Sequence, residues 1–149
     1  MEFKIPHAMN VEHEELHERL TRVIGAGGQT GAAGQAVAEA LHAHFGSEEA
    51  FALPPLGLLP ALAAGQVSPE MAPVLEMTER LKSEMPRMLA EHQAIVAALD
   101  RLVAAAQREG QADAVRFAEQ LRLHARNEEE VSYPAAILIG EYLKLKLGR

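Results

Sequence analysis

The segment His44-Phe45-Gly46-Ser47-Glu48-Glu49, followed by Pro54, recurs in outline as His124-Ala125-Arg126-Asn127-Glu128-Glu129, followed by Pro134. The His, both Glu and the Pro of the first segment each reappear 80 residues later in the second. A His and a Glu four residues apart lie on the same face of an α-helix, and a Pro favours a break in it. The chain therefore repeats a helix that carries a His-x-x-x-Glu pair close to its end.

A second match lies upstream in each half. Glu12-His13 corresponds to Glu91-His92, with an offset of 79 residues. The halves, about residues 5–60 and 80–140, therefore each predict a helical hairpin with one His on its first helix and a His/Glu pair on its second. Two such hairpins related by a pseudo-twofold axis would bring six side chains to the middle of a bundle: His13, His44, Glu48, His92, His124 and Glu128.

Apolar residues recur at helical spacing through most of the chain. This pattern predicts four long helices and a shorter C-terminal one, at about Asn10–Ile24, Gln35–Ala52, Ser68–Arg108, Asp113–Ser132 and Ala135–Leu147. Long amphipathic helices joined by short links favour an antiparallel up-down four-helix bundle. We therefore expect an all-α single domain over residues 1–149, with the short C-terminal helix packed on the bundle.

Capping and helix-breaking residues set the expected boundaries. Asn10 is a candidate N-cap of the first helix, and the Gly-rich stretch up to Gly34 reads as flexible. Ser68 followed by Pro69 predicts the start of the third helix, and Pro86 predicts a kink inside it. Residues 56–66 form a Pro- and Gly-punctuated connection with room for one helical turn. The fourth helix is expected to stop at Tyr133-Pro134.

Composition limits the classes of function. A chain of 149 residues fits one domain, and without Cys it forms neither disulfides nor thiolate metal sites. Fourteen basic against 21 acidic side chains leave no basic surface for nucleic acid. The N-terminal residues do not resemble a signal peptide, and no apolar stretch is long enough to span a membrane. These features favour a cytoplasmic protein and leave its oligomeric state open.

The six converging side chains suit a metal centre with two ions. Four imidazoles and two carboxylates offer eight donor atoms, so that each ion receives two His and one oxygen from each bridging Glu. Positions remain open for oxo, hydroxo, water or a small ligand. Nitrogen and oxygen ligands without sulfur favour iron or manganese, with zinc as a further candidate. The alternative is a metal-free structural bundle, in which burying these groups without partners would cost several kcal/mol.

The order of these residues resembles the hemerythrin-like family, also called the HHE cation-binding domain. The resemblance extends from about Ile5 to Tyr142 and includes the Glu-Glu and Pro endings of the second and fourth helices. It implies a non-haem diiron centre, oxo- or hydroxo-bridged, with a dioxygen-derived ligand. In that centre the bridging carboxylates would be Glu48 and Glu128, and the terminal imidazoles His13, His44, His92 and His124.

Two positions differ from the oxygen-carrying members of that family. The carriers have a pair of His four residues apart on the third helix, whereas the residues at that spacing from His92 are Met88 and Val96. The carriers also place the fourth-helix carboxylate five residues after its His, so that Glu129 competes with Glu128 for the bridging role. The resemblance therefore implies the diiron site without implying reversible oxygen carriage.

Other His and Glu residues allow more than one interpretation. His17 lies one turn after His13 and is a further candidate ligand, whereas His7 and His42 are expected at the surface. Glu12, Glu49, Glu91 and Glu129 could accept hydrogen bonds from ligand imidazoles, although solvated Glu is commoner. Two competing motifs are weaker. The zinc-protease pattern His13-Glu14-Glu15-Leu16-His17 lacks a substrate-aligning strand, and the ferritin-like pairs Glu14/His17 and Glu39/His42 have no counterpart on the third and fourth helices.

We therefore expect a diiron protein that binds dioxygen or another small diatomic ligand, in sensing, storage or iron handling. The alternative is a diiron enzyme that turns over peroxide or nitric oxide at the same centre. The expected partners are that small ligand and no nucleic acid or membrane, and the only cofactor is the metal. The sequence does not identify catalytic residues.

Overall fold

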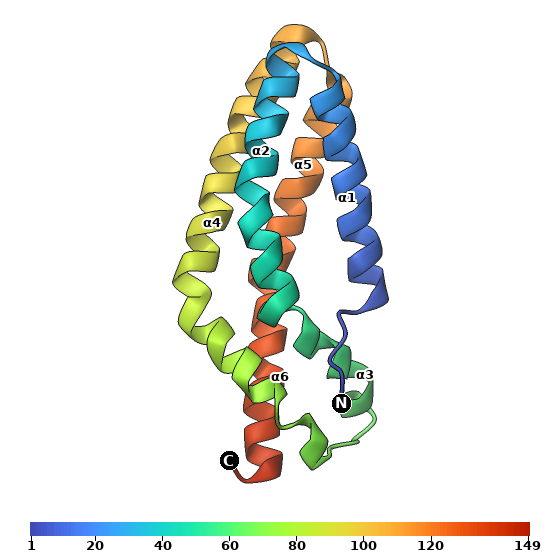
Figure 1. The fold of residues 1–149 in the computed structure, drawn as a ribbon, viewed down its shortest axis with the longest axis vertical. Coiled ribbons are helices and arrows are strands. Elements are labelled where there is room, and N and C mark those ends of the chain that lie inside the picture. The colour runs from blue at the N-terminus through green and yellow to red at the C-terminus, as the bar shows by residue number, and fades with distance from the viewer.

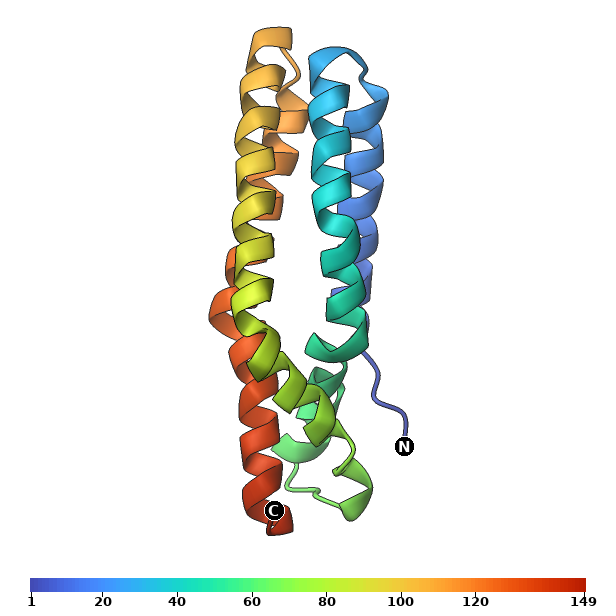
Figure 2. The ribbon, with the colours of Figure 1, turned by 60° about the vertical axis from the view of Figure 1, so that its left-hand side comes forward.

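The computed structural model describes residues 1–149, and the chain is almost entirely helical. Its α-helices are α1 (His7–Gly25), α2 (Gly28–Ser47), α3 (Leu59–Ala63), α4 (Val74–Glu109), α5 (Ala112–Asn127) and α6 (Tyr133–Leu147). Helices α1, α2, α4 and α5 run side by side in alternating directions, and α6 continues the line of α5 away from them (Figures 1 and 2). This arrangement confirms the predicted all-α, antiparallel up-down four-helix bundle.

Two π-helical turns mark the repeat in the structure. They are η1 (Glu48–Ala52) and η4 (Glu128–Ser132), and each follows directly on its helix, α2 or α5. In η1 the N–H of Leu53 donates to the carbonyl of Glu48 at 3.0 Å, five residues back. Single π-turns inside helices occur frequently at functional sites. Both turns begin at the Glu of a repeated His-x-x-x-Glu pair, which places the irregular backbone at that carboxylate.

The predicted end of the fourth helix at Tyr133-Pro134 is wrong. The chain remains helical from α5 through η4 into α6, because a Pro is tolerated in the first turn of a helix, where N–H groups have no partner. The extra residue of the π-turn also shifts the helical register. Val131, which regular α-helical spacing placed on the buried face, is 56 % exposed, while Ser132 and Tyr133 are buried.

The first two helices begin earlier than predicted. Helix α1 starts at His7, after Pro6, so Asn10 lies inside it and is not its cap. Helix α2 starts at Gly28 rather than Gln35, and the Gly-rich stretch is ordered helix. The Glu109 carboxylate at the end of α4 accepts the N–H groups of Gln29 and Thr30, at 3.2 and 2.6 Å. A carboxylate at a helix N-terminus satisfies free donors and complements the helix dipole.

Glycine in this part of α2 also permits close packing. A Cβ added to Gly31 would lie 2.6 Å from the carbonyl oxygen of Ile24, and one added to Gly34 would lie 3.0 Å from Val23. The sequence pattern that suggested flexibility therefore serves the tight α1–α2 contact.

The third long helix also starts later than the sequence indicated. Ser68 and Pro69 introduce only a 3-10 turn, η3 (Pro69–Met71), and Ser68 makes no side-chain cap hydrogen bond. Helix α4 begins at Val74 and contains Pro86, which removes one backbone donor. Figure 1 shows α4 bending in its yellow-green part, as the predicted kink requires. The connection before it forms a second 3-10 turn, η2 (Pro54–Leu58), and the short helix α3.

The hydrophobic core is divided in two along the bundle. One cluster joins α1, α2, α4 and α5 and includes Leu20, Leu99 and Phe117. The other joins the lower part of α4 with α6 and the η1–η2 segment and includes Phe51 and Leu143. No helix is long and apolar enough to cross a membrane. The repeated His and Glu residues lie at the level between the two clusters.

Candidate metal centre

All six residues of the repeat meet at one place inside the bundle. Their helices bring them in as follows: His13 from α1, His44 from α2 with Glu48 one turn later in η1, His92 from α4, and His124 from α5 with Glu128 one turn later in η4. Their ligand atoms form two groups, in each of which all atoms lie within 4.8 Å of one another. Both groups share Glu48 and Glu128. The arrangement thus provides two adjoining places for a cation with two common carboxylates.

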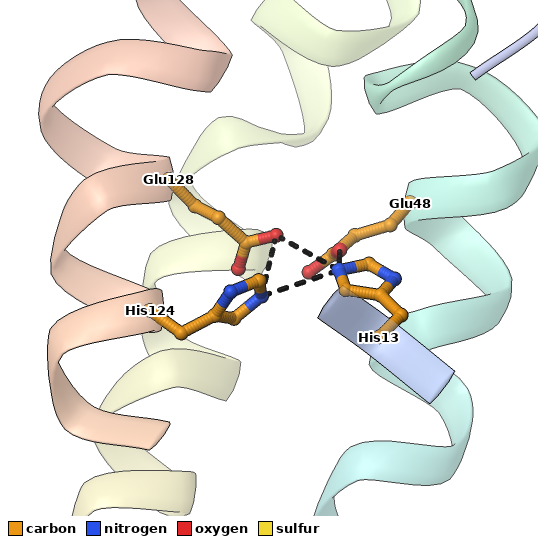
Figure 3. Close-up of side chains that lie close together, drawn as sticks. All are labelled: His13, Glu48, His124 and Glu128. Carbon is orange, nitrogen blue, oxygen red and sulfur yellow. Dashed lines mark hydrogen bonds and ion pairs between the residues drawn. The ribbon is translucent and has the colours of Figure 1, made fainter. Parts of the chain in front are cut away.

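The first group contains His13 and His124 (Figure 3). The Nε2 atoms of these two rings lie 3.2 Å apart. The His124 Nε2 atom is 3.3 Å from Oε2 of Glu128, and the His13 Nε2 atom is 3.5 Å from Oε2 of Glu48. Figure 3 shows the four side chains converging from opposite sides of the bundle on one point.

The second group contains His44 and His92 and is more deeply buried. Their Nε2 atoms are 2.8 Å apart. The His44 Nε2 atom lies 2.7 Å from Oε1 of Glu48, and the His92 Nε2 atom lies 3.4 Å from Oε1 of Glu128. The two oxygens of each carboxylate are therefore divided between the groups, Oε1 toward this one and Oε2 toward the first. That division is the geometry of a carboxylate bridge.

The outer nitrogens of three rings are held by further carboxylates. Nδ1 of His44 bonds to Glu91 at 3.1 Å, Nδ1 of His92 bonds to Glu129 at 2.9 Å, and Nδ1 of His124 bonds to Glu12. An ionised carboxylate only accepts hydrogen bonds, so Nδ1 carries the proton in each ring. In the neutral imidazoles, Nε2 then offers a lone pair toward the centre, which is the form that binds a metal ion.

Charges in the centre shift the pKa values in opposite directions. Burial raises the pKa of Glu48 to about 7. Burial also opposes ionisation of Glu128, but hydrogen bonds from His124 and His13 hold its pKa well below the usual range. Burial lowers the pKa of His124, yet Glu128 and Glu12 outweigh this effect and raise it to about 9. Without a cation, protons on Glu48 and His124 offset part of the buried negative charge.

Two atoms in the centre have no hydrogen-bond partner. They are Oε2 of Glu48 and Oε2 of Glu128, both buried and both on the side of His13 and His124. Unpartnered buried carboxylate oxygens are rare because desolvation is costly. Inward Nε2 lone pairs 2.8 Å apart repel one another for the same lack of a donor. A cation would satisfy both, so the residues present fit a metal ion.

Tyr133 is a member of the centre that the sequence did not single out. Its hydroxyl donates to Oε1 of Glu48 at 3.0 Å and lies 3.1 and 3.2 Å from Nε2 of His44 and His92. Burial, with the neighbouring carboxylates, raises its pKa far above the ordinary value, so the hydroxyl keeps its proton. The residue 80 positions earlier is Leu53. This oxygen therefore belongs to the second group alone and makes the two halves unequal.

The remaining candidates lie outside the two groups. His17 is exposed on α1, and His7 and His42 are exposed as expected. Glu129 contacts the outer nitrogen of His92, while Glu128 is the residue that reaches both groups. Glu12, Glu91 and Glu129 all bond to ring nitrogens of the centre, whereas Glu49 is exposed and makes no such bond.

Comparison with known proteins agrees with this geometry. The family described as Hemerythrin HHE cation binding domain matches residues 4–136, which include all six converging residues and Tyr133. No curated protein and no solved structure matches the chain. With a family match over most of its length and a His/Glu cluster that could hold a cation, the chain belongs to the hemerythrin HHE cation-binding domain family.

Proposed function

We propose that this protein holds two iron ions and binds dioxygen or another small diatomic ligand there, in sensing, storage or iron handling. The observation that carries the proposal is the pair of four-residue groups that share both Glu48 and Glu128. His13 and His124 would hold one ion, His44 and His92 the other, and the two carboxylates would bridge them. Nitrogen and oxygen ligands of this kind suit iron, with manganese or zinc less favoured.

Bound iron would supply open coordination positions for the small ligand and the electrons that it takes up. The chain's own residues supply position and charge. Glu12, Glu91 and Glu129 fix the ring orientation of three ligands through Nδ1, and Arg87 in turn donates to Glu91 at 3.0 Å. The flanking hydrophobic clusters exclude water from the centre on both sides. These supports favour ligands held in fixed positions.

A second candidate is turnover of peroxide or nitric oxide at the same centre. The observation that favours it is the Tyr133 hydroxyl, which keeps its proton and lies within 3.2 Å of two ligand nitrogens. A protonated group at this position can donate a hydrogen bond or a proton to a reacting oxygen, whereas a pure binding site has no need of one.

Assays on the iron-loaded protein separate the two candidates. The binding proposal predicts a visible spectrum that changes on exposure to dioxygen or nitric oxide and is restored when the gas is removed. Steady consumption of hydrogen peroxide or nitric oxide over many turnovers would instead support the enzyme. Under the enzyme candidate, Tyr133→Phe lowers that turnover without loss of iron. Under the binding proposal, it alters the spectrum only.

A further inference from the structure

A polar groove runs along the outside of the bundle between α1 and α2. Its volume is about 840 Å³, and its lining contains no Lys or Arg. Six of the lining residues are Glu or His from outside the metal centre, contributed by both helices and the start of η1: Glu14, His17, Glu18, Glu39, His42 and Glu49. We call this surface the α1–α2 groove. The two Glu-x-x-His pairs of the sequence, Glu14/His17 and Glu39/His42, both lie in it.

The four carboxylates of the α1–α2 groove are not neutralised by the protein. All four side chains are exposed, and none of them makes an ion pair. This differs from other acidic residues of the surface, such as Glu79 and Glu141, which bind Lys82 and Lys144. A cleft lined by one sign of charge concentrates ions of the opposite sign. The α1–α2 groove therefore attracts cations.

The α1–α2 groove leads to the metal centre. His13 is the one member of the centre that lines it. The side chain of His13 is 15 % exposed, against 2 % for His44 and for His92. The unpartnered Oε2 atom of Glu48, which is completely buried, lies 3.5 Å from Nε2 of His13. A cation that passes from the groove to His13 thus meets a buried carboxylate oxygen without a partner.

We propose that the α1–α2 groove is the route by which a divalent cation enters this protein. In this route Glu14, His17, Glu39 and His42 act as transient ligands that pass the cation to His13. The proposal rests on the metal centre proposed above, and it adds a second, weaker cation site in front of that centre. It also gives an order: the place of His13 and His124 is reached first, and that of His44 and His92 is filled through it.

Loading kinetics test the route. Metal-free protein is mixed with ferrous sulfate under nitrogen, the reaction is stopped with a chelator at set times, and protein-bound iron is counted. Glu14→Gln with Glu39→Gln removes two charges from the groove and none from the centre. The matched control is Glu76→Gln with Glu119→Gln, which removes two exposed and unpaired carboxylates elsewhere. The groove variant is expected to load about three- to tenfold more slowly than the control, and both should reach the wild-type iron content.

A second variant blocks the α1–α2 groove without touching its ligands. Gly46 lines the groove, and a Cβ added there would meet nothing within 4 Å. Gly46→Leu places a bulky side chain beside His13 and favours helix. It is expected to slow loading while the final iron content stays unchanged.

The outcomes distinguish this route from the metal centre itself. If the groove and control variants load at the same rate, or if Gly46→Leu loads as fast as the wild type, the route is wrong although the centre stands. If the wild type retains no iron after long incubation, the proposed function fails. A rate that falls with added salt in the wild type and less so in the groove variant supports the route.

Discussion

At the scale of single residues, the centre depends on which atom of each Glu faces inward. Glu128 divides its oxygens between the two groups, whereas the adjacent Glu129 reaches only the outer nitrogen of His92. Family resemblance alone left both residues as candidates for the bridge. The side-chain positions favour Glu128 as the bridge and give Glu129 a supporting role.

The two neighbouring carboxylates should therefore respond differently to the same change. Glu128→Gln removes a shared ligand and its charge, and we expect the purified protein to lose most of its iron. Glu129→Gln removes only a hydrogen-bond acceptor of His92, so we expect iron to be retained with about 10- to 100-fold weaker affinity. Iron analysis and chelator competition measure both effects. Equal loss of iron in the two variants would contradict this assignment.

Metal binding should also release protons, in a manner that depends on pH. The pKa of His124 is raised to about 9 and that of Glu48 to about 7, so both groups carry protons at lower pH that a metal ion displaces. Between pH 7 and 9 His124 alone contributes up to one proton, and below pH 7 Glu48 adds a second. Metal affinity therefore rises with pH, most steeply below pH 7. A dye-based measurement of proton release checks this, and binding with no release at pH 6.5 would exclude it.

The sequence predicted the six central residues because they share helical spacing and an 80-residue repeat, signals that survive without coordinates. Tyr133 gave no such signal, because its counterpart 80 residues earlier is Leu53 and its position depends on the π-turn. A rule that a π-turn adds one residue before a Pro would have moved Tyr133 onto the buried face.

At the scale of helices, boundaries were harder to predict than the helices themselves. Helix α2 begins seven residues earlier than expected because Glu109, distant in sequence, caps its Gly-rich start. Propensity rules treat Gly as a breaker and have no knowledge of a carboxylate from another helix. The same limit applies at Tyr133-Pro134, where the π-turn allows the helical run to continue.

The contact between α4 and α6 offers a test at this scale. A Cβ added to Gly140 on α6 would lie 2.7 Å from the Cβ of Thr78 on α4, whereas one added to Gly46 on α2 would meet nothing within 4 Å. Gly140→Ala is therefore expected to lower the free energy of unfolding by about 1–3 kcal/mol. Gly46→Ala should leave it unchanged or raise it by about 0.5–1 kcal/mol. Urea unfolding measures both, and a neutral Gly140→Ala would show that α6 is not packed closely on α4.

At the scale of the whole molecule, the polar centre separates two hydrophobic clusters of 14 and 13 residues. The bundle is thus joined across a layer of imidazoles and carboxylates, two of whose oxygens have no partner. A cation in this layer would link all four long helices at once. The repeat predicted this symmetry, but the division of the core required the coordinates.

Metal loading should therefore stabilise the whole bundle. Free metal at about 100 times its Kd adds about 2.7 kcal/mol to the free energy of unfolding. For a domain of this size that corresponds to a rise of about 5–10 °C in Tm. Calorimetry of metal-free and iron-loaded protein gives the shift, and Glu128→Gln serves as the control that should show little of it. An unchanged Tm in loaded wild type would mean that the ions bind at the surface instead.

The most direct test of the proposed centre is the iron content of protein purified after aerobic expression with iron supplied. Two groups of ligands that share Glu48 and Glu128 predict close to two iron atoms per chain. Glu48→Gln and Glu128→Gln should each reduce that content sharply in protein that is still folded. Fewer than about one iron per chain in the wild type, or an unchanged content in both variants, would contradict the assignment of this site as a diiron centre.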